Sequence, residues 1–131
     1  MKKIITIYLL MISQMSLASS VIDRVDGKTF FRSSDSLDCA VHIEKVSEHE
    51  IVSSDVVSTE MYQYYGSGND VWGKCRGDSS VRTCDSSGKC VFPGDSTPML
   101  WILPDGNILS NRSNGDTYKF FPSSSRQYFW Y

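Results

Sequence analysis

The sequence predicts a small all-β, single-domain protein: an antiparallel β-sandwich or barrel, stabilised by disulfide bonds. Three observations lead to this fold class. Short apolar stretches alternate with polar residues, turn-forming residues separate these stretches at close spacing, and four cysteines follow an apparent export signal in a chain of 131 residues. The first two features are typical of antiparallel strands joined by tight turns. The third is typical of small domains in oxidising compartments.

The N-terminus has the features of a secretory signal peptide. Two lysines precede an apolar run from Ile4 to about Ile12, and small residues follow it. Ser16 and Ala18 fit the small positions before a cleavage site, so cleavage is expected after Ala18. The apolar run is shorter than the roughly 20 residues that a membrane-spanning helix needs. We therefore expect a periplasmic or secreted protein without a membrane span.

The domain organisation follows from this cleavage site. Residues 1–18 are the predicted signal peptide, and residues 19–131 are predicted to form a single β-rich domain. The full sequence has a net charge of −2, and loss of the two signal lysines makes the mature chain more acidic. Nucleic-acid binding needs a basic surface, so we expect no nucleic-acid partner.

The strand predictions for the first half rest on residue type and period. Val41 and Ile43 alternate with polar residues, as in a half-buried strand. A helix over residues 40–50 is the alternative, because two glutamates lie one helical turn apart there. The β-branched residues of 51–59 favour a hairpin instead. The predicted strands of this half are 28–32, 37–46, 51–59 and the aromatic stretch 61–65.

Turn residues organise the C-terminal half. Pro104-Asp105-Gly106 predicts a tight turn between two short strands, and Asn114-Gly115 is the strongest hairpin signal in the chain. The predicted strands here are 99–103, 107–110, 117–121 and 126–131.

Four cysteines permit three disulfide pairings, which the sequence alone does not separate. The turn-forming residues between Cys84 and Cys90 favour a bridge across a hairpin. Cys39 would then pair with Cys75, and this is the pairing that we favour. Zinc is the alternative, but the cysteine spacing lacks the short knuckle of zinc sites. We expect neither a metal nor a cofactor.

Two segments of opposite charge are the clearest candidates for a contact surface. Residues 35–60 contain seven acidic residues and one basic residue, whereas residues 74–89 contain four basic and two acidic residues. Such segregation serves partner choice and association rate, although solvated surface is the simpler interpretation. The predicted binding residues are Glu44, Glu48 and Glu50, then Lys74, Arg76, Asp78, Arg82 and Lys89, with Trp72 as an aromatic contact. Arg76 and Arg82 are expected to be exposed charges.

The functional interpretation follows from export, charge and the motifs present. The chain has only two histidines and none of the common hydrolase or phosphate-binding motifs, so we do not expect an enzyme. The leading prediction is a binding protein that occludes another protein, such as an inhibitor or immunity-type factor against a cationic cell-wall hydrolase or toxin. The alternative is a glycan-binding adhesin or toxin-delivery subunit that uses exposed aromatic residues, with Trp72, Trp101 and Trp130 as stacking platforms.

Overall fold

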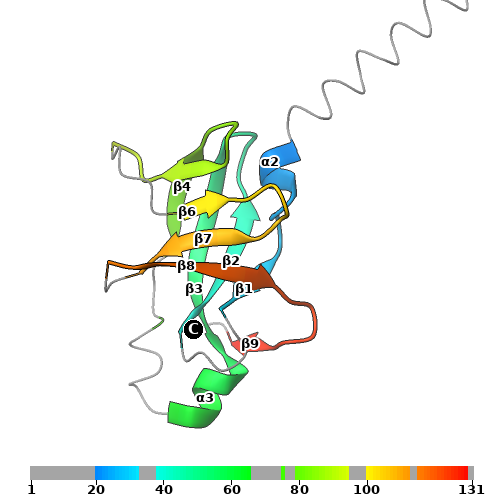
Figure 1. The fold of residues 1–131 in the computed structure, drawn as a ribbon, viewed down its shortest axis with the longest axis vertical. Helices are drawn as coiled ribbons and strands as arrows, with labels where there is room; N and C mark the ends of the chain where they lie inside the picture. Colours follow the sequence, from blue (N-terminus) through cyan, green and yellow to red (C-terminus); the bar gives the residue numbers. More distant parts are fainter. Residues whose placement is uncertain are drawn as a thin grey trace, which may run out of the picture.

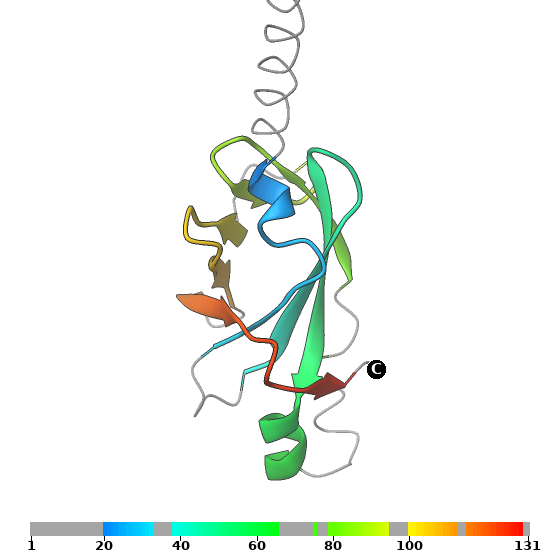
Figure 2. The same ribbon diagram turned by 90° about the vertical axis from the view of Figure 1, so that its right-hand side faces the viewer.

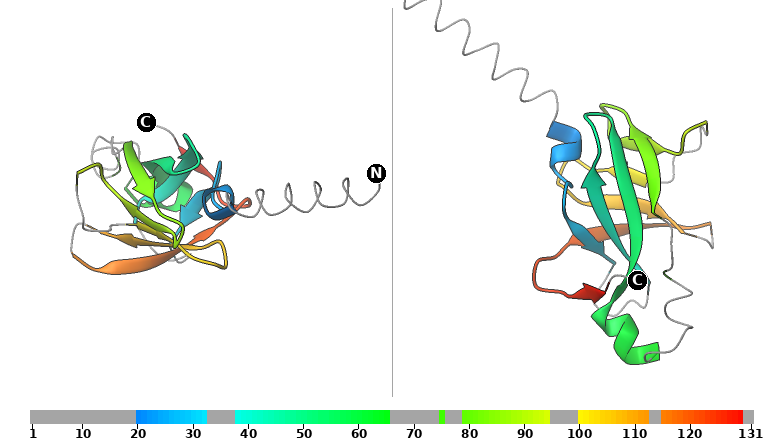
Figure 3. Two further views of the ribbon diagram at one scale, coloured as in Figure 1. Left: turned by 90° about the horizontal axis from the view of Figure 1, so that it is seen from above. Right: turned by 180° about the vertical axis from the view of Figure 1, so that it is seen from behind.

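The computed structural model describes residues 20–32, 38–65, 75, 79–94, 100–112 and 115–129. These residues form a β-barrel with a short helix at each end (Figures 1 and 3). The helices are α2 (Ser20–Asp23) and α3 (Thr59–Tyr65), and the strands are β1 (Thr29–Phe31), β2 (Ala40–Lys45), β3 (Glu50–Ser58), β4 (Ser80–Cys84), β5 (Lys89–Val91), β6 (Leu100–Ile102), β7 (Ile108–Asn111), β8 (Thr117–Pro122) and β9 (Tyr128–Phe129).

Strands β1 to β8 close into a barrel in which every neighbouring pair is antiparallel. Each strand pairs with the next one along the chain, and β8 returns to β1, where Phe30 lies opposite Pro122. Closure removes the exposed edges that an open sheet would have. β9 pairs with the last residues of β3. The all-β prediction is confirmed, and the architecture is the barrel rather than the sandwich.

The alternation along each strand separates the barrel interior from its outer face. In β2, Val41 and Ile43 point inward, and Ile51 of β3 joins them in a buried cluster with Phe30 and Phe120. Residues 40–50 therefore form two strands and the turn between them, which confirms the hairpin and excludes the helix. Burial of such side chains stabilises the fold by about 1.5–3 kcal/mol each.

Helix α2 closes one end of the barrel (Figure 2). Ile22 is 2% exposed and Val25 is fully buried, and both belong to the same apolar cluster as the barrel interior. The chain then turns into β1, because Asp26 N donates to Ile22 O at 3.1 Å. The interior at this end is consequently filled by side chains rather than by solvent.

The strand predicted at residues 61–65 is wrong, because these residues belong to helix α3. Ser58 caps the helix by accepting a hydrogen bond from Met61 N at 3.2 Å, and Glu60 lies in the first turn. Met61 is buried, and its sulfur lies 3.3 Å from that of Cys75. The cap and this tertiary contact thus stabilise the helical conformation of the segment. Neither can be recognised from the spacing of apolar residues in the sequence.

The two disulfide bonds join the pairs that the sequence favoured, Cys39–Cys75 and Cys84–Cys90. Cys84 and Cys90 lie opposite each other in the β4–β5 hairpin. Gly88 in its turn adopts a φ of +91°, and a Cβ there would collide with the carbonyl oxygen of Ile102. The Cys39–Cys75 bridge packs with Met61 beneath α3.

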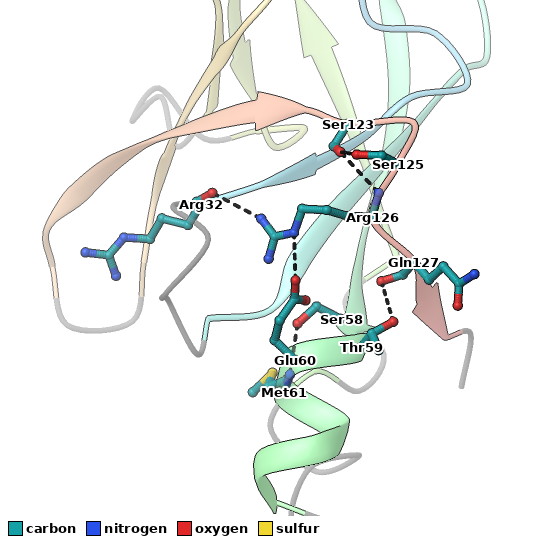
Figure 4. A network of polar contacts seen from close by, with 9 residues as sticks. All are labelled: Arg32, Ser58, Thr59, Glu60, Met61, Ser123, Ser125, Arg126 and Gln127. Carbon is teal, nitrogen blue, oxygen red and sulfur yellow. Dashed lines mark hydrogen bonds and ion pairs between the residues drawn. The ribbon is translucent and has the colours of Figure 1, made fainter.

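The C-terminal segment crosses the outside of the barrel and is fixed to α3 by polar contacts (Figure 4). Arg126 Nε lies 3.0 Å from Glu60 Oε1, and Arg126 Nη1 donates to the carbonyl of Arg32 at 3.4 Å. Gln127 O accepts hydrogen bonds from both the amide and the hydroxyl of Thr59. These contacts hold the segment so that β9 adds to β3.

The Glu60–Arg126 pair predicts a loss of stability in acid. The hydrogen bond from Arg126 lowers the pKa of Glu60. Because the pKa is lower in the folded state, the pair stabilises the fold above the unfolded pKa of about 4.3, and this contribution disappears as the pH falls through the folded pKa. We expect Glu60→Gln to weaken the dependence of the free energy of unfolding on pH below about pH 4.5. The change in this free energy should be less than about 1 kcal/mol, because the pair is partly exposed.

Urea unfolding of the parent and Glu60→Gln, compared at neutral and acidic pH, measures this contribution. The pKa of Asp85 is also lowered, mainly by the hydrogen bond from the Ser87 hydroxyl. Asp85 therefore also stabilises the fold less as the pH falls. Asp85→Asn is therefore the matched control for a carboxylate away from α3. Identical pH profiles for Glu60→Gln and the parent would contradict the assignment.

Candidate functional site

The structure does not gather the predicted basic residues on one exposed surface. Lys89 is exposed on β5, whereas Arg82 of β4 points into the barrel. Arg82 lies opposite Ile51, a core residue, so the prediction that Arg82 is an exposed charge is wrong. The remaining predicted contact residues of this region lie outside the described residues: Trp72, Lys74, Arg76 and Asp78.

Arg82 is held inside the barrel by two contacts. Its Nε donates to Ser53 Oγ at 2.9 Å, and its Cζ lies 4.1 Å from the centroid of the Phe92 ring. The guanidinium is half-buried, and its Nη1 is shielded from solvent without a hydrogen-bond partner among the described residues. An unbonded buried donor of this kind costs about 1–3 kcal/mol, and more when it is charged.

Two further charged side chains accompany Arg82 in the barrel. Arg112 follows β7, and its Nη1 lies 3.6 Å from Asp55 Oδ1 of β3. The side chain of Arg112 is 17% exposed and that of Asp55 is 22% exposed, so solvent reaches both in part. Arg112 Cζ also lies 5.5 Å from the centroid of the Phe120 ring. We call Arg82, Arg112 and Asp55 the arginine site.

The arginine site has more positive than negative charge. Burial lowers the pKa of Arg82, Asp55 raises it, and the like charge of Arg112 lowers it further. Within the described part of the chain, Asp55 thus pairs with Arg112 and also acts electrostatically on Arg82, in a partly desolvated space. Such a space strengthens the attraction of a second carboxylate, and a guanidinium can bind a carboxylate through two parallel hydrogen bonds.

A third arginine, Arg32, follows β1 and is already neutralised. It forms an ion pair with Asp38, and hydrogen bonding to that carboxylate raises the pKa of Arg32. Its Cζ lies 3.5 Å from the centroid of the Tyr118 ring. Arg32 therefore stabilises the barrel wall and adds no excess charge to the arginine site.

The acidic candidates occupy different positions on β2, β3 and the turn between them. Glu44 is exposed on the outer face of β2, where its Oε1 lies 2.7 Å from His42 Nε2. Glu50 accepts a hydrogen bond from the Ser47 hydroxyl at 3.0 Å, and Glu48 is exposed in the turn. These three glutamates are near in sequence, but their side chains have separate local partners.

A second acidic group surrounds Lys45 at the end closed by α2. Lys45 Nζ lies 2.9 Å from Asp23 Oδ1, and the Lys45 amide donates to Asp26 Oδ1 at 2.8 Å. Hydrogen bonding to Asp23 raises the pKa of Lys45, with smaller contributions from Asp26 and Glu48. We call Asp23, Asp26 and Glu48 the acidic end; it places three carboxylates around one ammonium.

Of the three tryptophans considered for glycan stacking, one lies within the described residues. Trp101 lies in β6 and is half-buried, while Trp72 and Trp130 lie outside the described residues. The large exposed aromatic side chains in the described ranges are instead Tyr64 of α3, at 69% exposure, and Phe121 of β8, at 45%.

Sequence reasoning missed the pairing of Arg112 with Asp55. The signal was present, because Ile108, Ser110 and Arg112 have the same parity and the first two are buried in the barrel.

In the ranges that the structure describes, no group of three histidine, cysteine, aspartate or glutamate side chains could hold a metal ion. No helix within these ranges has the length and apolar character needed to cross a membrane.

No family model, curated protein or solved structure matches this chain.

Proposed function

We propose that this protein is an exported binding protein that occludes another protein, as an inhibitor or immunity-type factor does, and that the arginine site receives a carboxylate of that partner. The observation that carries the proposal is the excess positive charge of Arg82 and Arg112 beside the single carboxylate of Asp55, at a place where Arg112 and Asp55 remain partly exposed. A partner carboxylate that contacts Arg112 would supply the missing negative charge. Export is supported by the two disulfide bonds, which are typical of oxidising compartments.

Cell-wall glycosidases fit the chemistry of such a partner. These hydrolases generally use a pair of carboxylates that flank the scissile bond. A protein whose guanidinium groups pair with one of these carboxylates would both bind the enzyme and block its cleft. Buried charge pairs of this kind can contribute strongly to affinity when both partners are hydrogen-bonded.

The acidic end supports a second contact with the same class of partner. Asp23, Asp26 and Glu48 outnumber the single Lys45 beside them, so this end attracts a cationic surface. Long-range attraction of this type raises the association rate and weakens with salt. The arginine site and the acidic end therefore make separable predictions.

Inhibition of lysozyme, a cell-wall glycosidase, tests the proposal with matched variants. We expect the parent to slow cell-wall lysis and the double substitution Arg82→Met with Arg112→Met to weaken inhibition by about a hundredfold or more, as truncation of a buried charge pair does. Charge reversal at Asp23 and Glu48 of the acidic end should change mainly the association rate and its salt dependence. Lys119→Met, which removes an exposed charge paired with Asp105, is the control.

Unchanged inhibition by the arginine double variant, with loss after charge reversal at Asp23 and Glu48, would assign the contact to the acidic end instead. If neither variant loses inhibition, neither the arginine site nor the acidic end is the contact surface. Thermal unfolding of each variant separates lost binding from lost folding.

A further inference from the structure

A pocket of about 430 Å³ lies between the start of β1 and the C-terminal segment, away from the barrel interior. Its volume falls within the range of small-molecule sites. The lining residues belong to the turn before β1, to β1 itself, to the end of β8 and to the segment that leads into β9: Gly27, Lys28, Thr29, Pro122, Ser123, Ser124, Arg126 and Tyr128.

The charged residues that line the pocket are both cations. Lys28 is exposed, and its Nζ has no ion-pair or hydrogen-bond partner in the described ranges. Arg126 is fixed in the wall by Glu60, and its Cζ lies 4.3 Å from the centroid of the Phe31 ring. Among the described residues, Lys28 is thus the unpaired cation of the pocket, whereas Arg126 is already paired with Glu60. The lining residues include no carboxylate, which favours an anionic group in the ligand.

The hydroxyl of Thr29 gives the pocket a hydrogen-bond acceptor. Thr29 Oγ1 lies 2.7 Å from His42 Nδ1, and His42 Nε2 lies 2.7 Å from Glu44 Oε1. In a neutral imidazole, donation from Nε2–H to the carboxylate leaves Nδ1 as an acceptor, so Thr29 must donate its proton to Nδ1. The lone pairs of Thr29 Oγ1 can then only accept, and a ligand hydroxyl can donate to them.

Tyr128 completes the pocket with an aromatic ring. The ring stacks on His42, with centroids 5.8 Å apart, so the Thr29–Glu44 chain and the C-terminal segment hold it in place. A fixed aromatic ring beside hydrogen-bonding groups suits the face of a sugar ring. We propose that this pocket binds a sugar that carries a carboxylate: its hydroxyls donate to Thr29, and its carboxylate pairs with Lys28.

Titration with glucuronate, followed by the amide NMR shifts of the full mature protein, tests this site. Glucose supplies the hydroxyls without the carboxylate, and acetate supplies the carboxylate without the ring. We expect saturable shifts at Thr29 and Ser123 with glucuronate, and about tenfold weaker binding of either control ligand, as loss of a charge-assisted hydrogen bond predicts.

Two variants locate the interaction. Lys28→Met should weaken glucuronate about tenfold and leave glucose unchanged, whereas Thr29→Val should weaken both sugars. Lys119→Met, on β8 and paired with Asp105, should leave glucuronate binding as in the parent. If Thr29→Val fails to fold in a thermal melt, Lys28→Met decides alone. Acetate binding as tight as glucuronate, absence of saturable shifts, or an unaffected Lys28→Met would overturn the proposal.

Discussion

Replacing Cys39 and Cys75 together with alanine is expected to lower the free energy of unfolding by about 4 kcal/mol. The bridge closes a loop across a sequence separation of 36 residues, and the chain-entropy model gives about this value for such a loop. The bridge also packs beneath α3 with Met61, which is 2% exposed. For a domain of this size, the melting temperature should fall by about 10–20 °C.

The second bridge is the matched control. Cys84 and Cys90 are separated by 6 residues, for which the same model gives only about 2 kcal/mol. Differential scanning calorimetry of both double-alanine variants compares the two losses directly. Equal losses, or a larger loss from the short bridge, would show that native packing rather than loop length determines the stabilisation.

Replacing Asp55 with asparagine is expected to destabilise the fold by about 2–4 kcal/mol. The substitution removes the carboxylate that pairs with Arg112 and offsets the charge of Arg82, and removing one partner from a buried ion pair is strongly destabilising. The effect should lie below that of a fully buried pair, because Asp55 retains 22% exposure. Urea unfolding at neutral pH measures it.

The double-mutant cycle with Arg82→Met identifies the cause. Arg82→Met alone should change stability by less than about 1 kcal/mol, because it removes a desolvated charge along with the bond to Ser53. Adding Arg82→Met to Asp55→Asn should recover a large part of the loss, since only one guanidinium then remains. Additive losses would mean that the charges are independent and that the arginine site has no excess charge.

The fold was predictable where local pattern and global structure agree. Alternation in β2 marked Val41 and Ile43 as interior, and Pro104-Asp105-Gly106 forms the expected turn, with Gly106 at a φ of +85°. Closure of the sheet was not predictable, because the β8–β1 pairing joins residues about ninety positions apart and depends on no local signal. Helix α3 was missed for the related reason that its cap and its packing on Cys75 decide its conformation.

The sites were harder to predict than the fold. Arg82 was selected from the basic composition of its segment, but its inward direction follows from strand parity in a hairpin whose register the structure supplied. Arg112 and Asp55 come from strands far apart in sequence, and only the barrel brings them together. The pocket beside Tyr128 likewise combines residues from the two ends of the described chain, so it could not be predicted from the composition of either segment.

Calorimetric titration of the mature protein with lysozyme, and with a lysozyme variant whose two catalytic carboxylates are replaced by amides, tests the arginine site most directly. We predict a 1:1 complex with active lysozyme and an affinity at least about tenfold lower for the amide variant, because an amide cannot neutralise the excess guanidinium charge. Substitution of Arg82 and Arg112 by methionine should abolish that difference between the two enzymes. Equal affinity of the parent protein for lysozyme and its amide variant would contradict the proposal that the arginine site receives a partner's carboxylate.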